Sequence, residues 1–301
     1  MDLWIPITVF AAFCQNLRSA LQKHLKGRLG TSGATFVRFA YGVPFAWLYV
    51  WGLNAGLGLP FPELPLVFYP LAFLGGLAQI AATFLLIHLF SYRNFTAGTA
   101  YSKTEPIQAA LFGWLLIGET VTLSAGIGIL LGVIGVVTVS LAREPKDLAS
   151  MASALSSRPA FIGLASAGLF GASAALYRSA ALSLEGTGYL MQAGFALALV
   201  TLFQTFVMGA WMAVRRPAEL SATIRTWRSS VFVGITGIAG SIGWFTAMTL
   251  QQVAYVRALA QIELVFTLLF SVFVFREKLR QAEIIGCLLI GAAVVVVVLA
   301  S

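Results

Sequence analysis

Long apolar segments separated by short polar connections run through the whole chain. Ten of these segments have about 20 residues, the length that an α-helix needs to cross a hydrocarbon core of roughly 30 Å. Transmembrane β-strands would be about half as long and would alternate polar with apolar residues, so the pattern favours helices. The sequence therefore predicts an all-α membrane protein with spans at residues 3–22, 33–53, 66–90, 95–117, 121–142, 160–182, 187–213, 230–251, 254–275 and 282–300.

One polar, serine-rich stretch, residues 143–159, interrupts this pattern and resembles a linker. It divides the chain into two five-helix halves, residues 1–142 and 160–301. The segment Thr99–Ala142 of the first half returns in weakened form as Arg257–Ala300 in the second half. At a constant offset of 158 residues, the equivalent positions are Glu105 and Glu263, Glu119 and Glu277, and Gly128 and Gly286. We interpret the halves as repeats of one five-helix unit.

Composition agrees with a membrane protein. Hydrophobic residues make up 59% of the chain and charged residues 10%, against roughly 45–50% and 25% in soluble domains. The net charge of +8 would suit a nucleic-acid partner, but the basic residues sit in short connections and not on one polar face. The two cysteines, Cys14 and Cys287, lie inside apolar segments and indicate neither a disulfide framework nor a metal site.

The connections predict the orientation in the membrane. Fourteen of the 19 Lys and Arg residues fall in the odd-numbered connections, whereas the even-numbered ones carry only Glu63, Glu119 and Glu185. Basic loops stay in the cytoplasm, so both termini are expected outside it. With five spans in each half, the halves insert upside down relative to each other. Inverted repeats of this kind place a transporter's substrate site near the midplane.

Several short motifs resemble one known family. The first half contains Glu105-Pro106, then Gly118-Glu119-Thr120 at a tight turn, then a glycine-spaced helix; the second half repeats this with Leu264 in place of Pro106 and Arg276 in place of Gly118. Arg38 also matches a common family position. Together these features resemble the EamA-like branch of the drug/metabolite transporter superfamily. The resemblance implies a ten-helix transporter with a central cavity for small metabolites.

Seven charged residues lie within the predicted spans: Arg18, Arg38, Lys103, Glu105, Arg178, Arg257 and Glu263. A charge at mid-membrane costs at least about 2.5–3.5 kcal/mol, so each is expected to face a cavity or a partner.

Glu105 and Glu263 are expected near the centres of their helices and close to one another across the repeat axis. They would bind a cationic group or take up a proton. Alternatively they are permanent ion-pair partners, Glu105 of Lys103 and Glu263 of Arg257. Residues two apart on a helix do not face each other, so Lys103 needs another helix to meet a carboxylate. It supplies either the positive half of a site or a structural partner for a Glu elsewhere.

The arginines and several neutral residues complete the candidate site. Arg18, Arg38, Arg178 and Arg257 lie near membrane edges, where they either extend to the interface or line the cavity mouths and attract anions. Tyr101 and Gln108 share the Glu105 face of a helix, and Gln79 and Trp244 are candidates for hydrogen bonding and stacking. Glu119 and Glu277 are expected to cap the helices that follow them, and the glycine-rich spans 66–90 and 230–251 are expected to pack closely. The predicted substrate-binding residues are Arg18, Gln79, Tyr101, Lys103, Glu105, Gln108, Arg178, Trp244, Arg257 and Glu263.

These observations favour a secondary active transporter of a small polar or zwitterionic metabolite, such as an amino acid, working by alternating access in a bacterial inner membrane. The alternative is an exchanger or flippase for organic anions, phosphorylated sugars or lipid-linked sugars, which arginines lining the cavity would favour. No Walker loop, HExxH or GxSxG motif or Cys/His cluster occurs in the sequence. We therefore expect no enzyme activity, cofactor, metal or nucleic-acid partner, and we expect membrane lipid, a small-molecule substrate and a coupling proton as partners of a monomer or homodimer.

Overall fold

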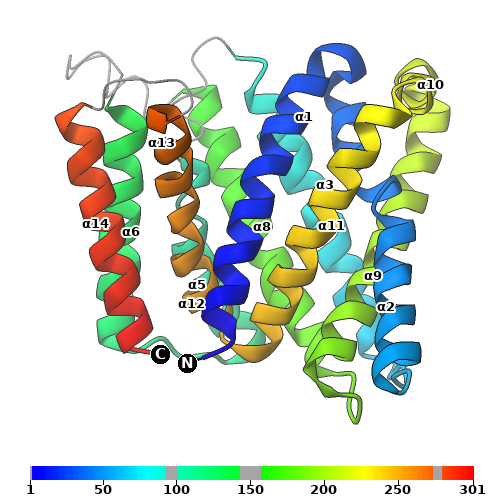
Figure 1. The fold of residues 1–301 in the computed structure, drawn as a ribbon, viewed down its shortest axis with the longest axis horizontal. Helices are drawn as coiled ribbons and strands as arrows, with labels where there is room; N and C mark the ends of the chain where they lie inside the picture. Colours follow the sequence, from blue (N-terminus) through cyan, green and yellow to red (C-terminus); the bar gives the residue numbers. More distant parts are fainter. Residues whose placement is uncertain (1, 93–100, 143–156, 274–279) are drawn as a thin grey trace.

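The structure, a computed structural model, describes residues 2–92, 101–142, 157–273 and 280–301. The described residues form a helical bundle without β-strands (Figure 1). Its elements are α1 (Trp4–Ala40), α2 (Val43–Leu57), α3 (Phe68–Leu89), α5 (Glu105–Ile117), α6 (Leu123–Leu141), α8 (Arg158–Leu182), α9 (Gly188–Arg215), α10 (Pro217–Arg225), α11 (Trp227–Leu250), α12 (Val253–Leu259), the 3₁₀ turn η1 (Ala260–Ile262), α13 (Glu263–Phe273) and α14 (Gln281–Leu299).

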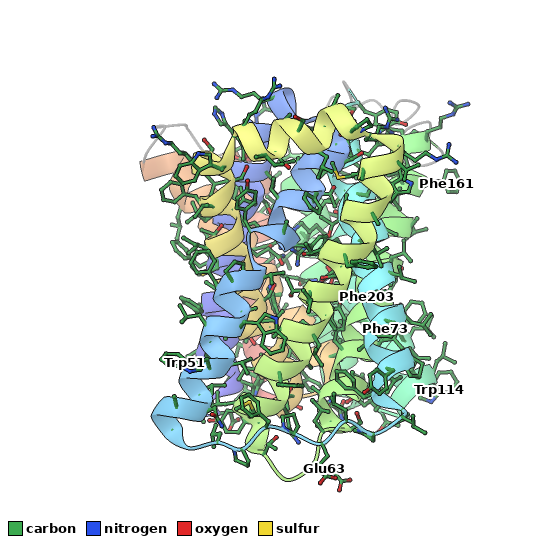
Figure 2. The ribbon with its side chains drawn as sticks, turned by 90° about the vertical axis from the view of Figure 1, so that its right-hand side faces the viewer. Trp51, Glu63, Phe73, Trp114, Phe161 and Phe203 are labelled. Atoms are coloured by element: carbon green, nitrogen blue, oxygen red, sulfur yellow. The ribbon has the colours of Figure 1, made fainter. Side chains whose placement is uncertain are left out.

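The outside of the bundle is apolar. Figure 2 shows Trp51, Trp114 and Phe161 directed away from the helices, and these side chains are 63%, 58% and 64% exposed. In water such a surface would be unfavourable, whereas lipid chains cover it at no cost. Six helices, α3, α6, α8, α9, α11 and α14, are long and apolar enough to cross a membrane, and α5 is a shorter apolar helix. The chain is therefore a multi-pass integral membrane protein; the count of ten spans and the inverted repeat stay predictions.

Helices from the two halves of the chain alternate in the bundle. The most extensive contacts join α1 with α11, α3 with α8, and α6 with α14. Each pair takes one helix from each half, so neither half packs as a separate unit. Glycine residues, which have no side chain, allow these helices to approach closely. A Cβ at Gly75 of α3 would lie 2.8 Å from the Tyr177 ring of α8, and one at Gly135 of α6 would lie 2.8 Å from the carbonyl oxygen of Gly286. Glycines of the third and eighth expected spans lie at such close approaches, as predicted for small residues in membrane helices.

Two expected spans contain a break that the hydrophobic pattern did not reveal. Residues 95–117 and 254–275 were each expected to be one helix, but α5 begins at Glu105 after a turn, and α12 passes through η1 before α13 begins at Glu263. Proline explains the first break, because Pro106 has no N–H to donate to the carbonyl of Ser102 and instead fits the first turn of a new helix. Nothing in the sequence explains the second. Both carboxylates thus stand in the first turn of a helix, where the helix dipole favours negative charge.

The connection between the first two expected spans also differs from expectation. Residues 23–32 were expected to form a loop, but α1 continues through them to Ala40. The helix bends at Gly30, whose φ of 68° is a left-handed value that suits glycine. A short helix that was not predicted, α10, lies at the end of the bundle opposite both termini (Figure 1). Its Glu219 accepts a hydrogen bond from the backbone N–H of Gly33 at 3.2 Å, which ties α10 to the bent region.

Candidate substrate cavity

A cavity lies between the helices at the level of the two helix breaks. Its empty volume, including the open side, is about 670 Å³. Both halves of the chain contribute to its wall. The lining residues are Gln15, Arg18, Ser19, Arg38, Gln79, Leu86, Ser102, Lys103, Glu105, Phe170, Tyr177, Ser241, Trp244, Phe245, Met248, Arg257 and Glu263.

The two carboxylates of the cavity are paired crosswise between the halves of the chain. Lys103 Nζ of the first half forms an ion pair with Glu263 Oε1 of the second. Arg257 of the second half approaches Glu105 of the first, with 3.1 Å between Nη1 and Oε1. This second contact is an ion pair without hydrogen-bond alignment, since Glu105 Oε1 receives no hydrogen bond within the described chain. The alternative of pairing within each half is therefore wrong, whereas Lys103 does meet a Glu on another helix, as its position two residues from Glu105 required.

Glu263 is held more firmly than Glu105. Its second oxygen, Oε2, accepts a hydrogen bond from Gln15 Nε2 at 3.0 Å. Its backbone carbonyl accepts another from Asn16 Nδ2 at 3.2 Å, and Asn16 also donates to Thr267 at 2.9 Å. These bonds attach the start of α13 to α1, so Glu263 has a structural function alongside its place in the cavity wall.

Arg18 and Arg38 bring positive charge into the cavity without a direct ion pair among the described residues. Each is 4% exposed, so neither extends to the membrane interface. Arg38 donates from Nη1 to Thr83 Oγ1 at 3.0 Å, and Nε of Arg18 has no hydrogen-bond partner in the part of the chain that the structure describes. Within that same part, no carboxylate oxygen lies within 4.0 Å of either guanidinium.

Trp244 adds a further donor to the wall. The guanidinium carbon of Arg257 lies 4.8 Å from the centre of its ring, a distance typical of cation–π contacts. The indole Nε1 is buried, and no described residue accepts its proton. Trp244 thus stacks on a charged residue of the site, whereas its contact with a substrate stays a prediction.

Gln79 belongs to a hydrogen-bonded network in the cavity wall. Its Oε1 accepts from the Tyr177 hydroxyl at 3.1 Å and from Gln204 Nε2 at 2.9 Å. Gln204 also donates to the carbonyl of Gly76 at 3.1 Å. Gln204 and Tyr177 are almost entirely buried.

Arg178, predicted to bind substrate, lies outside the cavity lining. It forms an ion pair with Glu119, in the turn between α5 and α6, and donates to the carbonyls of Met248 and Gln251, the latter at 2.8 Å. The other oxygen of Glu119 accepts from the backbone N–H of Val253, the first residue of α12, at 3.3 Å. Arg178 and Glu119 therefore join α8, the α5–α6 turn and the α11–α12 turn.

The expected cap of α6 is consequently wrong. Glu119 serves α12, while α6 is capped by Thr122, whose hydroxyl accepts from the N–H of Ala125 at 3.3 Å. The equivalent expectation for Glu277 lies outside the described residues.

Tyr101 and Gln108 are also absent from the cavity lining. The turn at Lys103 and Thr104 separates them from a common helix face, and Gln108 donates to Thr104 Oγ1 at 3.0 Å. Conversely, the predicted binding residues did not include Arg38, Gln15, Ser102 or Ser241, although each is a polar residue in an apolar span.

No cluster of three or more His, Cys, Asp or Glu residues that could hold a metal ion occurs among the described residues.

Comparisons with known proteins agree with this architecture. One solved structure, titled only "Crystal structure of protein", is similar with a TM-score of 0.71 and 19% sequence identity over 99% of this chain and 97% of that one. At this identity the likeness shows the fold alone. A search of curated proteins finds no match. The model of the EamA-like transporter family matches the sequence twice, at residues 2–141 and 157–299, and the chain therefore belongs to the EamA-like transporter family.

Proposed function

We propose that the protein is a secondary active transporter that carries a small organic anion across the membrane by alternating access. The supporting observation is the charge of the cavity. Four basic residues line it, Arg18, Arg38, Lys103 and Arg257, against two acidic ones, Glu105 and Glu263. A buried charge without a counter-ion is costly, so an anion that enters the cavity relieves a cost that the empty protein carries.

The arginines support one of the two substrate classes that the sequence left open. Arg18 and Arg257 line the cavity, as does Arg38, which favours organic anions over the amino-acid-like zwitterions expected first. Zwitterions remain the second candidate because Glu105 and Glu263 also stand in the wall. A ligand ammonium group could replace Lys103 or Arg257 as the partner of a carboxylate.

Other parts of the proposal rest on sequence. The absence of a Walker loop favours an ion gradient or exchange as the driving force, with a proton on Glu105 or Glu263 as the coupling ion. The basic connections favour a bacterial inner membrane with both termini outside the cytoplasm. Both chain ends lie at one end of the bundle (Figure 1), and the loop that carries Glu63 lies at the lower end of the bundle in Figure 2.

The test is thermal unfolding of the purified protein in detergent with a ligand panel of dicarboxylates, sugar phosphates, amino acids and organic cations at pH 6 and pH 8. A ligand at 100 times its Kd stabilises the folded state by about 2.7 kcal/mol. We expect anions to stabilise the wild type and to lose this effect in Arg18→Gln. The exposed Arg158 provides the matched control Arg158→Gln, which should respond like the wild type. Stabilisation by cations alone would contradict the proposal, and stabilisation by amino acids alone would support the second candidate.

A further inference from the structure

We infer that Gln204 and Tyr177 hold the side-chain amide of Gln79 in one orientation, so that its NH₂ group faces the cavity and donates to an acceptor oxygen of the ligand. The orientation follows from the network alone, whereas the nature of the ligand rests on the proposed function.

The carbonyl of Gly76 fixes the first member of the network. An amide side chain can turn by 180° with little change of shape, so its partners decide which end is nitrogen. A backbone carbonyl only accepts hydrogen bonds. The atom of Gln204 that lies 3.1 Å from the Gly76 oxygen must therefore be Nε2. Gln204 is 1% exposed, so water does not supply an alternative partner.

Gln204 then fixes Gln79. Nε2 of Gln204 can only donate, and it lies 2.9 Å from one polar atom of the Gln79 amide, which must be Oε1. The Tyr177 hydroxyl donates to the same oxygen at 3.1 Å. With Oε1 taken by two donors, Nε2 is the remaining polar atom of a side chain that lines the cavity. No described residue accepts its protons.

This donor narrows the class of substrate. Arg18 and Trp244 also line the cavity, and Arg18 Nε and Trp244 Nε1 lack acceptors within the described chain, so three side chains of the wall carry N–H groups without an acceptor there. A ligand ammonium group has no lone pair and would leave these donors unmatched, at a cost of about 1–3 kcal/mol for each buried group. The basic residues of the wall engage the carboxylates of an anionic ligand, so an oxo or hydroxy group is the further acceptor that Gln79 would bind. We therefore assign Gln79 as a specificity residue and Gln204 and Tyr177 as its positioning residues.

The functional test uses two probes that differ by one acceptor oxygen, 2-oxoglutarate and glutarate. In the wild type we expect 2-oxoglutarate to bind about tenfold more tightly, the equivalent of one hydrogen bond. The variant Gln204→Met keeps the volume and removes the donor, so Gln79 can turn and the preference should fall to below twofold. The matched control is Gln192→Met on the same helix, because Gln192 donates to the carbonyl of Leu184 away from the cavity; it should keep the preference.

The orientation is tested without a ligand by NMR of protein labelled with ¹⁵N-glutamine. The NH₂ protons of Gln79, assigned with Gln79→Glu, should exchange rapidly with water, and those of Gln204 should be protected. In Gln204→Met the exchange of the Gln79 protons should slow, because the turned amide donates to Tyr177.

The two proposals fail in different ways. Protected Gln79 protons in the wild type, or an unchanged probe preference in Gln204→Met, would overturn this inference. So would an equal response to both probes, or no response to either, while other anions bind. Exchangeable Gln79 protons in a protein that no anion stabilises would overturn the proposed function and leave the oriented amide standing.

Discussion

Two arginines in similar sequence surroundings, Arg18 and Arg178, differ in their contacts in this protein. Arg18 lies in Leu17-Arg18-Ser19-Ala20 and Arg178 in Tyr177-Arg178-Ser179-Ala180. Arg178 binds a carboxylate and backbone carbonyls, including that of Met248 at the end of α11. Arg18 lines the cavity with Nε unpartnered among the described residues. The arginine of this segment thus joins helices in the second half of the chain, whereas in the first half it places a positive charge in the cavity wall.

The difference has an energetic meaning. The last carbonyls of a helix have no partner within the helix, so Arg178 satisfies groups at the end of α11 that would otherwise be unpaired. Its removal also leaves Glu119 buried without a counter-ion. Arg18 forms no direct ion pair within the described chain, so its burial is a cost that a bound anion would reduce. Residues that serve function in this way often lower the stability of the empty protein.

The largest expected effect comes from Arg178→Gln. Removing one partner of a buried ion pair typically costs about 3–5 kcal/mol, so the melting temperature in detergent should fall sharply without any ligand. Arg18→Gln is the matched comparison and should leave the ligand-free melting temperature unchanged or raised. Equal losses in the two variants would show that the two arginines have the same structural function.

The next effect concerns binding. In the presence of an anion at 100 times its Kd, Arg18→Gln should lose most of a stabilisation of about 2.7 kcal/mol. Thermal unfolding with increasing ligand measures this loss. A conservative Arg18→Lys should retain part of it, because the charge remains and the planar, forked donor geometry is lost. If both Arg18 variants bind the anion as tightly as the wild type, the charge surplus does not attract the substrate.

The crosswise ion pairs predict a smaller coupling. Lys103→Met and Glu263→Gln should each destabilise the protein, and the double variant should be more stable than the sum of the two losses implies, with a coupling energy of about 0.5–3 kcal/mol. The control cycle combines Lys103→Met with Glu105→Gln, which is not the partner of Lys103 in this structure. A larger coupling energy between Lys103 and Glu105 than between Lys103 and Glu263 would show that Lys103 pairs with the Glu of its own half.

The smallest effect is expected for Trp244→Phe. Phenylalanine keeps a ring beside Arg257 and removes the indole N–H, so the loss should be about 0.5–1.5 kcal/mol of ligand affinity. Stability without ligand should change little, since Nε1 has no partner in the described chain. A marked drop in ligand-free stability would indicate that the N–H serves the fold and not the ligand.

Sequence reasoning reached part of this arrangement. Apolar segment lengths predicted the helices, and charges inside those segments predicted Arg18, Lys103, Glu105, Arg257 and Glu263, all of which line the cavity. Pro106 is a sequence signal for the first helix break, although residues 95–117 were predicted as one helix. The break before Glu263 has no such signal, because η1 consists of ordinary helix-compatible residues.

The positions that could not be predicted depend on contacts between distant segments. Arg178 looked equivalent to Arg18, and only the packing of the α5–α6 turn against α8 supplies Glu119 as its partner. Gln204 is one of several polar residues in an otherwise apolar helix, and its importance arises from α3, more than 100 residues earlier in the sequence. Periodicity describes one helix at a time, whereas these functions arise where three helices meet.

The crosswise pairing also has a consequence for biosynthesis. Glu105 enters the membrane with the first half of the chain, but its partner Arg257 is translated about 150 residues later. At roughly 5–20 residues per second, the nascent protein spends several seconds or more with this carboxylate unpaired. During that interval the first half of the chain lacks the helices that it packs against in the final structure. The last helices to leave the ribosome therefore complete the packing of the first half.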